Sequence, residues 1–128
     1  MPGPKFRVAL TALAATALMT SAGFAVEKPK SLDLGIFTFL SGPSAAYGLP
    51  GKQGDDLMIE QINAAGGIGG VPVTATYVDE AQGAEGVIAE YRRLAEGGGA
   101  QAMIAALSSG NCRALSPLSD QLKMPTIG

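Results

Sequence analysis

The first side chains that could do chemistry lie in a glycine-containing segment at residues 40–50. This segment carries the hydroxyls of Ser41 and Ser44 and the aromatic ring of Tyr47, and it follows an almost continuous apolar run at residues 32–39. It contains no acid, base or metal ligand. Hydroxyls, backbone amides and an aromatic wall can hold a small molecule, but they do not supply a tuned proton donor or acceptor. The segment therefore indicates binding and not catalysis.

A second group of polar residues follows another apolar run, at residues 102–107. Ser108, Ser109 and Gly110 stand there, just before a third helical stretch. Helix amino ends bind anions because their first N–H groups lack partners, so a carboxylate held by the Ser109 hydroxyl and the N–H of Ser109 or Gly110 is physically sound. Serine at this place also fits simple helix capping, and both roles can hold at once. For Tyr47 the alternative is ordinary packing of a loop residue.

Other chemistries lack the residues that they need. The chain has no histidine, which excludes a Ser-His-Asp triad and an imidazole metal site. The acidic pairs Asp55-Asp56 and Asp79-Glu80 are better explained by solvation on a helix face and in a loop than by metal binding. The glycines at residues 66–70 follow a helix and precede a strand, the reverse of a dinucleotide fingerprint. We therefore expect no enzyme activity, no cofactor and no metal site.

Composition bounds the class of protein. The chain has 128 residues, of which 47% are apolar and 16% charged, so one domain with a packed core is expected. The formal net charge is −2 and no basic cluster occurs, which argues against nucleic-acid binding.

The amino terminus has the layout of a secretory signal peptide at residues 1–25. Lys5 and Arg7 precede an apolar run at residues 8–19, and small residues Gly23 and Ala25 suit cleavage after position 25. The alternative, a membrane anchor, would need roughly 20 apolar residues. We therefore expect an exported, periplasmic domain at residues 26–128.

Hydrophobic patterning predicts alternating strands and helices. Strands are expected at 32–39, 71–78, 102–107 and from 124, and helices at 51–65, at 84–96 and from 111 or 116, where Pro117 disturbs the pattern. This order predicts an α/β three-layer sandwich, a parallel sheet in the flavodoxin-like strand order 2-1-3-4 with helices on both faces. The strand at residues 71–78 is expected near an edge. The polar segments then meet at the crevice between the first and third strands.

Four stretches of the chain, read together, resemble the type I periplasmic binding proteins. They are most similar to the branched-chain amino-acid binding proteins of ABC importers, and the resemblance runs from residue 32 to residue 128. The stretches are Ser41-Gly42-Pro43 with Ala45-Ala46-Tyr47-Gly48, Ile62-Asn63-Ala64-Ala65-Gly66-Gly67-Ile68, Tyr77-Val78-Asp79-Glu80 and the strand into Ser108-Ser109-Gly110.

The resemblance implies two α/β lobes that close on a ligand and deliver it to an ABC permease in the inner membrane. It implies that Ser109 holds an α-carboxylate and that Tyr47 lines the pocket, with Ser41, Ser108 and Gly110 beside them. Relatives that bind leucine, isoleucine and valine often carry a disulfide between the loop after the second strand and the end of the third strand. In this chain Ser108 stands at the end of the third strand, and residues 79–83 contain no cysteine. The ligand could also be an amide, urea or an aromatic acid. The chain would cover only about half of the first lobe.

Two other classes stay open at this stage. A ligand-sensing module of a receptor or regulator can use the same lobe, and an enzyme can be built on a flavodoxin-like sheet. An enzyme of that kind should show an acid, a base or a phosphate-binding loop at the strand ends, and the chain offers none there.

Overall fold

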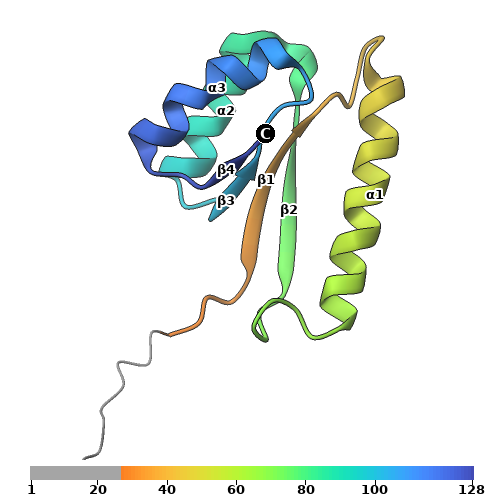
Figure 1. Ribbon diagram of the computed structural model, residues 1–128, viewed down its shortest axis with the longest axis vertical. Coiled ribbons are helices and arrows are strands. Elements are labelled where there is room, and N and C mark those ends of the chain that lie inside the picture. Colours follow the sequence, from red (N-terminus) through yellow and green to blue (C-terminus); the bar gives the residue numbers. More distant parts are fainter. Residues whose placement is uncertain (1–26) are drawn as a thin grey trace, which may run out of the picture.

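The computed structural model describes residues 27–128, and the predicted signal peptide lies outside the described residues. Strands and helices alternate along the chain (Figure 1). In order they are β1 (Leu32–Thr38), α1 (Ala45–Ala64), β2 (Val73–Asp79), the 3₁₀ turn η1 (Glu80–Gln82), α2 (Gly83–Glu96), β3 (Ala102–Ile104), α3 (Ser109–Leu122) and β4 (Thr126–Ile127).

The four strands form one parallel sheet in the order β2-β1-β3-β4. The predicted α/β fold, its flavodoxin-like strand order and the edge position of β2 are confirmed. Because parallel crossovers are right-handed, the helix that leads to β2 must lie on the opposite face from the helices that lead to β3 and β4. Figure 1 shows α1 alone on one side of the sheet and α2 with α3 on the other.

The hydrophobic core lies between the sheet and the pair α2 and α3. Its largest fully buried side chains include Phe37, Tyr91, Leu94, Met103 and Leu115. The Tyr91 hydroxyl lies 2.6 Å from the Thr126 hydroxyl, so the polar tip of this buried ring has a partner. The buried side of α2 is the side that the sequence predicts.

Helix α1 begins earlier than the sequence predicts, at Ala45 instead of residue 51. Pro50 and the nearby glycines are weak helix formers, which is why the pattern places the start after them. Tertiary contact overrides that preference: a Cβ on the buried Gly48 would lie 1.9 Å from the Phe39 carbonyl oxygen. The glycine therefore lets the first turn of α1 press against the end of β1.

The Asn-Ala-Ala-Gly-Gly motif at residues 63–67 forms the end of α1 and the turn after it, and two of its residues have clear structural roles there. The Asn63 side chain accepts from the Val73 N–H at 2.7 Å and donates to the Val73 carbonyl at 2.8 Å, which ties the end of α1 to the start of β2. Gly67 has φ +77°, and a Cβ there would meet the Val71 carbonyl oxygen at 2.1 Å. Only glycine fits this close approach.

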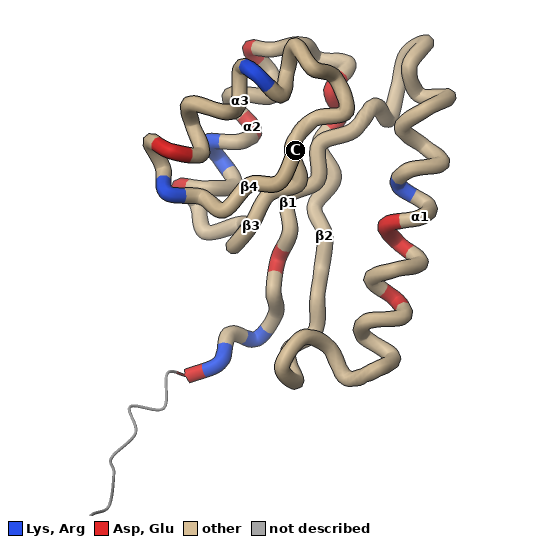
Figure 2. The backbone as a smooth tube through the Cα atoms, in the orientation of Figure 1, with Lys and Arg blue, Asp and Glu red and all other residues tan. Residues whose placement is uncertain are grey.

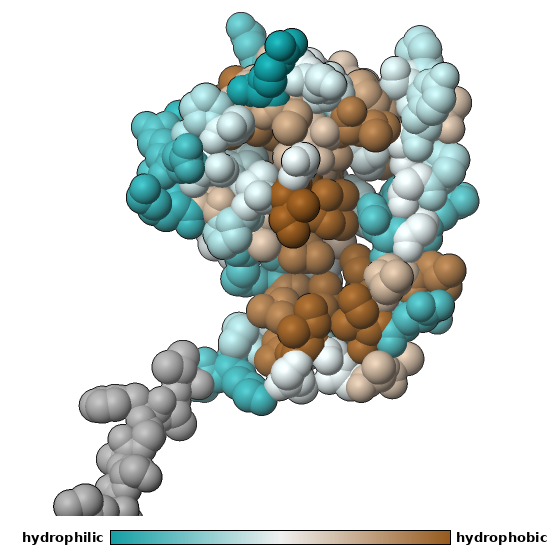
Figure 3. Space-filling view, viewed as in Figure 1, coloured by the Kyte–Doolittle hydropathy of each residue, from teal (hydrophilic) through white to brown (hydrophobic). Residues whose placement is uncertain are grey.

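The face of the sheet beside α1 is only partly covered. The predicted buried stripe of α1 is wrong at Gly54, Met58 and Ala65, which are exposed, and Leu57 beside the stripe is exposed as well. Asp55 is half-buried instead of facing away. Desolvation raises the pKa of Asp55, with the nearby Asp56 carboxylate adding to the shift. An apolar hollow of about 210 Å³ lies here, lined by Leu34, Ile36, Asp55, Met58, Ile59, Ile62, Ile68, Val73 and Ile104. Figure 3 shows a continuous hydrophobic patch over the middle of the sheet.

The remaining boundaries differ from the prediction by a few residues. Strand β3 ends at Ile104, and α3 begins at Ser109 and passes through Pro117. Neither predicted start of this helix, at 111 or 116, is correct. The earlier start brings Ser109 and Gly110 into its first turn.

Candidate functional site

The candidate site lies at the carboxyl edge of the sheet, where β1 and β3 are neighbours. The chain leaves β1 towards α1 and leaves β3 towards α3, and these two helices lie on opposite faces (Figure 1). In open α/β sheets, diverging connections of this kind form the crevice in which ligands bind. Both polar segments singled out in the sequence therefore lie at the same edge.

The loop after β1 is anchored by Asp79, the last residue of β2. One carboxylate oxygen of Asp79 accepts from the Ser41 hydroxyl at 2.5 Å, and the other accepts from the N–H groups of Leu40 and Ala81, each at 3.0 Å. The Ser41 hydroxyl is the main cause that lowers the pKa of Asp79 below its usual value, and the backbone N–H groups add to it. Since the Ser41 proton is directed at Asp79, this hydroxyl offers a ligand an acceptor and not a donor.

The link between β3 and α3 is anchored by Glu80. Its carboxylate, only 1% exposed, accepts from the N–H groups of Leu107 at 2.5 Å and Ser108 at 3.0 Å, and from the Asn111 amide at 3.0 Å. The sequence-based interpretation of Asp79-Glu80 as a solvated acidic pair is therefore wrong. The signal that could have found this role was position: Asp79 ends β2 and Glu80 directly follows it, at the same edge of the sheet as the two polar segments.

The start of α3 presents open hydrogen-bonding groups. Ser108 occupies the N-cap position with extended backbone, φ −81° and ψ 124°, but its hydroxyl makes no capping bond. Ser109 and Gly110 are exposed in the first turn, whose N–H groups have no acceptor within the helix, and the turn contains no acidic residue. This end of α3 is chemically suited to an anionic or carbonyl oxygen.

Tyr47 lies in the first turn of α1, after the carboxyl end of β1. Its side chain is 76% exposed, so the alternative of ordinary loop packing is wrong. The next residue, Gly48, is buried against β1, which fixes the turn that carries the ring. An exposed aromatic ring at this edge can serve as an apolar wall with a polar tip.

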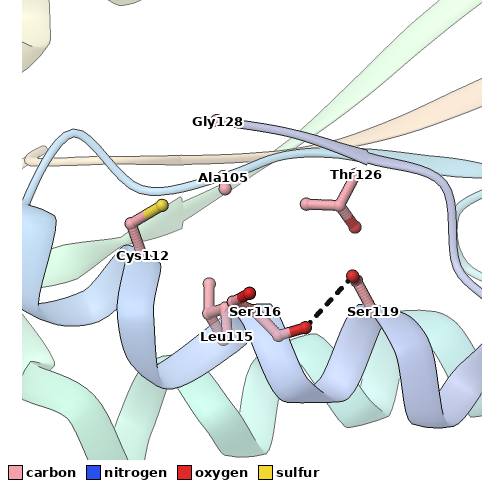
Figure 4. A pocket seen from close by; sticks show the side chains of 7 residues that line it. All are labelled: Ala105, Cys112, Leu115, Ser116, Ser119, Thr126 and Gly128. Atoms are coloured by element: carbon pink, nitrogen blue, oxygen red, sulfur yellow. Dashed lines mark hydrogen bonds between the residues drawn. The ribbon is translucent and has the colours of Figure 1, made fainter.

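The five predicted ligand residues line an open edge and not a closed pocket. Neither the hollow beside α1 nor a second cavity, of about 120 Å³ between α3 and β4, is lined by any of them. Figure 4 shows the second cavity, bordered by Ala105, Cys112, Leu115, Ser116, Ser119, Thr126 and Gly128. Figure 2 shows charged residues mainly on the helices and in the segment before β1. At the edge itself, the carboxylates of Asp79 and Glu80 accept hydrogen bonds from the protein, so binding there would rest on hydroxyl and backbone groups.

Two features are absent from residues 27–128. This part of the chain holds no cluster of three or more potential metal ligands. Within the same range, no helix has both the length and the apolar character needed to span a bilayer.

A family model described as periplasmic binding protein matches residues 31–128. The chain belongs to the periplasmic binding protein family. The resemblance identified from the sequence is therefore confirmed, and the parallel sheet in the order 2-1-3-4 is that of a type I periplasmic binding protein lobe.

Relatives of this periplasmic binding protein include the Leu/Ile/Val-binding protein homolog 3 of Brucella melitensis biotype 1. The two chains are 34% identical over 89 residues, which cover 69% of this chain and 24% of the relative. This chain thus spans about a quarter of the length of that relative.

Solved structures show the same likeness. The branched-chain amino acid transporter substrate binding protein LivJ of Streptococcus pneumoniae, in complex with isoleucine, is 26% identical with a TM-score of 0.70, over 76% of this chain and 28% of LivJ. A putative branched-chain amino acid ABC transporter from Rhodospirillum rubrum is 29% identical with the same TM-score, over 75% of this chain and 28% of its own.

Proposed function

We propose that this chain is the amino-terminal part of the substrate-binding component of an ABC importer. Its ligand is an amino acid or a related small carboxylate or amide, held between two lobes of which this chain supplies part of the first. The observation that carries the proposal is the exposed start of α3 at the carboxyl end of β3, beside the loop after β1, in a chain of this family. The names of the Brucella relative and of LivJ support the ligand class.

In this proposal each predicted site residue has a role that its position permits. The ligand carboxylate accepts hydrogen bonds from the Ser109 hydroxyl and from the N–H of Ser109 and Gly110. Tyr47 covers the aliphatic part of the ligand. The hydroxyl oxygens of Ser41 and Ser108 contribute further polar contacts. The second lobe supplies the partner of the ligand's ammonium group and encloses the ligand.

The proposal extends to the cellular role. The chain is exported by the predicted signal peptide at residues 1–25, works in the periplasm and presents its closed form to an ABC permease in the inner membrane. It catalyses no reaction, because binding, closure and release suffice for delivery.

The test is a titration of the isotope-labelled chain followed by NMR. L-Leucine is compared with acetate, which carries only the anionic group, and with 3-methylbutylamine, which carries only the ammonium and the side chain. We expect leucine and acetate to shift the amide signals of Ser109 and Gly110 with dissociation constants in the millimolar range, about −4 kcal/mol, because half a cleft encloses little of the ligand. The amine should leave these two signals unchanged.

Variants sharpen the titration. Ser109→Ala removes one hydrogen bond to the carboxylate and should weaken leucine binding about fivefold. Ser116→Ala, on the same helix but bordering the other cavity, is the matched control and should bind like the parent chain. Absence of any response at Ser109 and Gly110 would contradict the proposed site. Micromolar affinity of this chain alone in calorimetry would contradict the two-lobe mode of binding.

A further inference from the structure

We propose that Glu80 is a positioning residue for ligand binding: its buried carboxylate sets the orientation of the first turn of α3. This inference rests on the proposed function, because it assigns the ligand carboxylate to that turn. It concerns a residue that touches no ligand and acts through Leu107, Ser108 and Asn111.

The first observation is that both oxygens of the buried Glu80 carboxylate accept hydrogen bonds from the protein. One oxygen accepts from Leu107, and the other accepts from Ser108 and Asn111. A buried carboxylate is costly unless hydrogen bonds compensate its lost hydration, and bonds to an ionised acceptor are stronger than neutral ones. Glu80 therefore holds these three donors firmly.

The second observation is that the link from β3 to α3 has few other anchors. The Ala105 N–H donates to the Ile127 carbonyl at 2.6 Å, which ties the beginning of the link to β4. Ala106 is buried in the core, whereas the next side chain, Leu107, is 56% exposed and cannot anchor the rest of the link by packing. The two N–H bonds to Glu80 then determine how the backbone enters α3.

The third observation is the division of donors between Glu80 and solvent. Glu80 takes the N–H of Ser108, the N-cap residue, while the exposed Ser109 and Gly110 follow in the first turn. The N–H groups of these two residues therefore remain for a ligand. Without the Glu80 carboxylate, the Ser108 N–H would lose its acceptor and the turn would lose its fixed direction.

The experiment compares Glu80→Gln with the parent chain by residue-resolved hydrogen exchange without ligand. Glutamine has one acceptor oxygen where glutamate has two, so at least one backbone N–H loses its partner. We expect exchange at Leu107 and Ser108 to become about tenfold faster, because one lost hydrogen bond corresponds to roughly that change. Exchange at Val78 and Tyr91, in the core, should change much less. Glu90→Gln, on the surface of α2, is the charge-matched control.

A second measurement separates positioning from general stabilisation. Val87→Ala opens a cavity in the core, away from the site, and destabilises the fold. At equal stability, set by temperature, Glu80→Gln should bind acetate and leucine about tenfold more weakly than Val87→Ala does, since the donors are misdirected only in the former. Equal affinities in these two variants would overturn the inference. Asn111→Ala keeps both backbone hydrogen bonds to Glu80 and should lower the affinity for acetate and leucine by an intermediate factor. This variant replaces Glu80→Gln in the comparison if Glu80→Gln fails to fold.

The two proposals fail in different ways. Unchanged exchange at Leu107 and Ser108 in Glu80→Gln would overturn the positioning role, whether or not the parent chain binds leucine. A parent chain without any response to acetate or leucine would overturn the proposed binding site and, with it, the ligand part of this inference.

Discussion

Gly48 shows how a single residue sets the position of Tyr47, a candidate ligand contact. It is buried in the first turn of α1, next to the exposed Tyr47, and a Cβ there would lie 1.9 Å from the Phe39 carbonyl oxygen. No side chain fits this space unless the helix moves away from the end of β1.

We therefore predict that Gly48→Ala lowers the free energy of unfolding by about 1–3 kcal/mol, the usual range for overpacking. Urea denaturation followed by circular dichroism measures it. The matched control is Gly51→Ala in the same helix, where an added Cβ meets no atom within 4 Å. That variant should gain up to about 1 kcal/mol from helix propensity. Equal effects of the two substitutions would show that the contact with Phe39 is unimportant.

Asp79 gives a prediction on pH. The Ser41 hydroxyl, and then the N–H groups of Ala81 and Leu40, lower the pKa of Asp79 in the folded state. A lowered pKa means that the folded state binds this proton less readily than the unfolded state does. The resulting stability is present above the ordinary aspartate pKa of about 4 and is lost as the pH falls towards the folded-state value.

Asp79→Asn should therefore be less stable than the parent chain at pH 7, and its stability should fall less steeply between about pH 5 and pH 3. Urea unfolding at several pH values in this range measures both. The stability of Asp79→Asn should still decrease somewhat as the pH falls, because hydrogen bonds also lower the pKa of Asp33 and Asp56. An unchanged slope in Asp79→Asn would mean that its contacts with the loop after β1 do not favour the charged carboxylate.

At the scale of elements, the end of α1 is held by side-chain chemistry more than by burial. Helix α1 borders the hollow, and of its residues only Gly48 is fully buried. The Asn63 amide compensates at the carboxyl end by pairing with both backbone groups of Val73. At the other end of β2, the Tyr77 hydroxyl donates to Asp56 at 2.8 Å, which adds a second tie between α1 and β2.

Asn63→Asp should lower the free energy of unfolding by about 1–3 kcal/mol at pH 7. Aspartate keeps an acceptor for the Val73 N–H but places a second, negatively charged oxygen against the Val73 carbonyl. Gln61→Glu makes the same change of charge on an exposed residue half a turn away and should be close to neutral. Chemical denaturation of both variants decides the point, and similar losses in the two would refute a specific role of Asn63.

At the scale of the whole molecule, the two faces of the sheet are unequal. Helices α2 and α3 bury one face, while α1 leaves an apolar hollow and exposed apolar side chains on the other (Figure 3). Among the described residues, strand β4 lies at the edge of the sheet, and its Ile127 is 77% exposed. Exposed apolar patches and free strand edges favour association.

We expect this chain to self-associate at high micromolar concentration through the hollow. Met58→Lys places a charge at its rim and should weaken association about tenfold, since burying an unpaired charge is costly. Leu57→Lys, at an equally exposed neighbour that does not line the hollow, is the control and should have little effect. Sedimentation equilibrium measures both. A parent chain that stays monomeric and unfolds cooperatively would contradict the expectation.

Hydrophobic spacing by itself determined the order of strands and helices, the parallel sheet and the buried side of α2. These features depend on local pattern and on chain handedness, which act without distant partners. The motifs also indicated the family and the edge where a ligand would bind.

Only the tertiary structure decided where α1 and α3 begin and what Asp79 and Glu80 do. The start of α1 depends on the contact of Gly48 with Phe39, and the burial of Glu80 depends on donors at Leu107, Ser108 and Asn111. These partners lie 9 to 31 positions away along the chain, and an acidic residue after a strand has the same local pattern whether water or backbone N–H groups surround it. Folding brings the donors to the carboxylates, and these contacts make Asp79 and Glu80 the support of the candidate site.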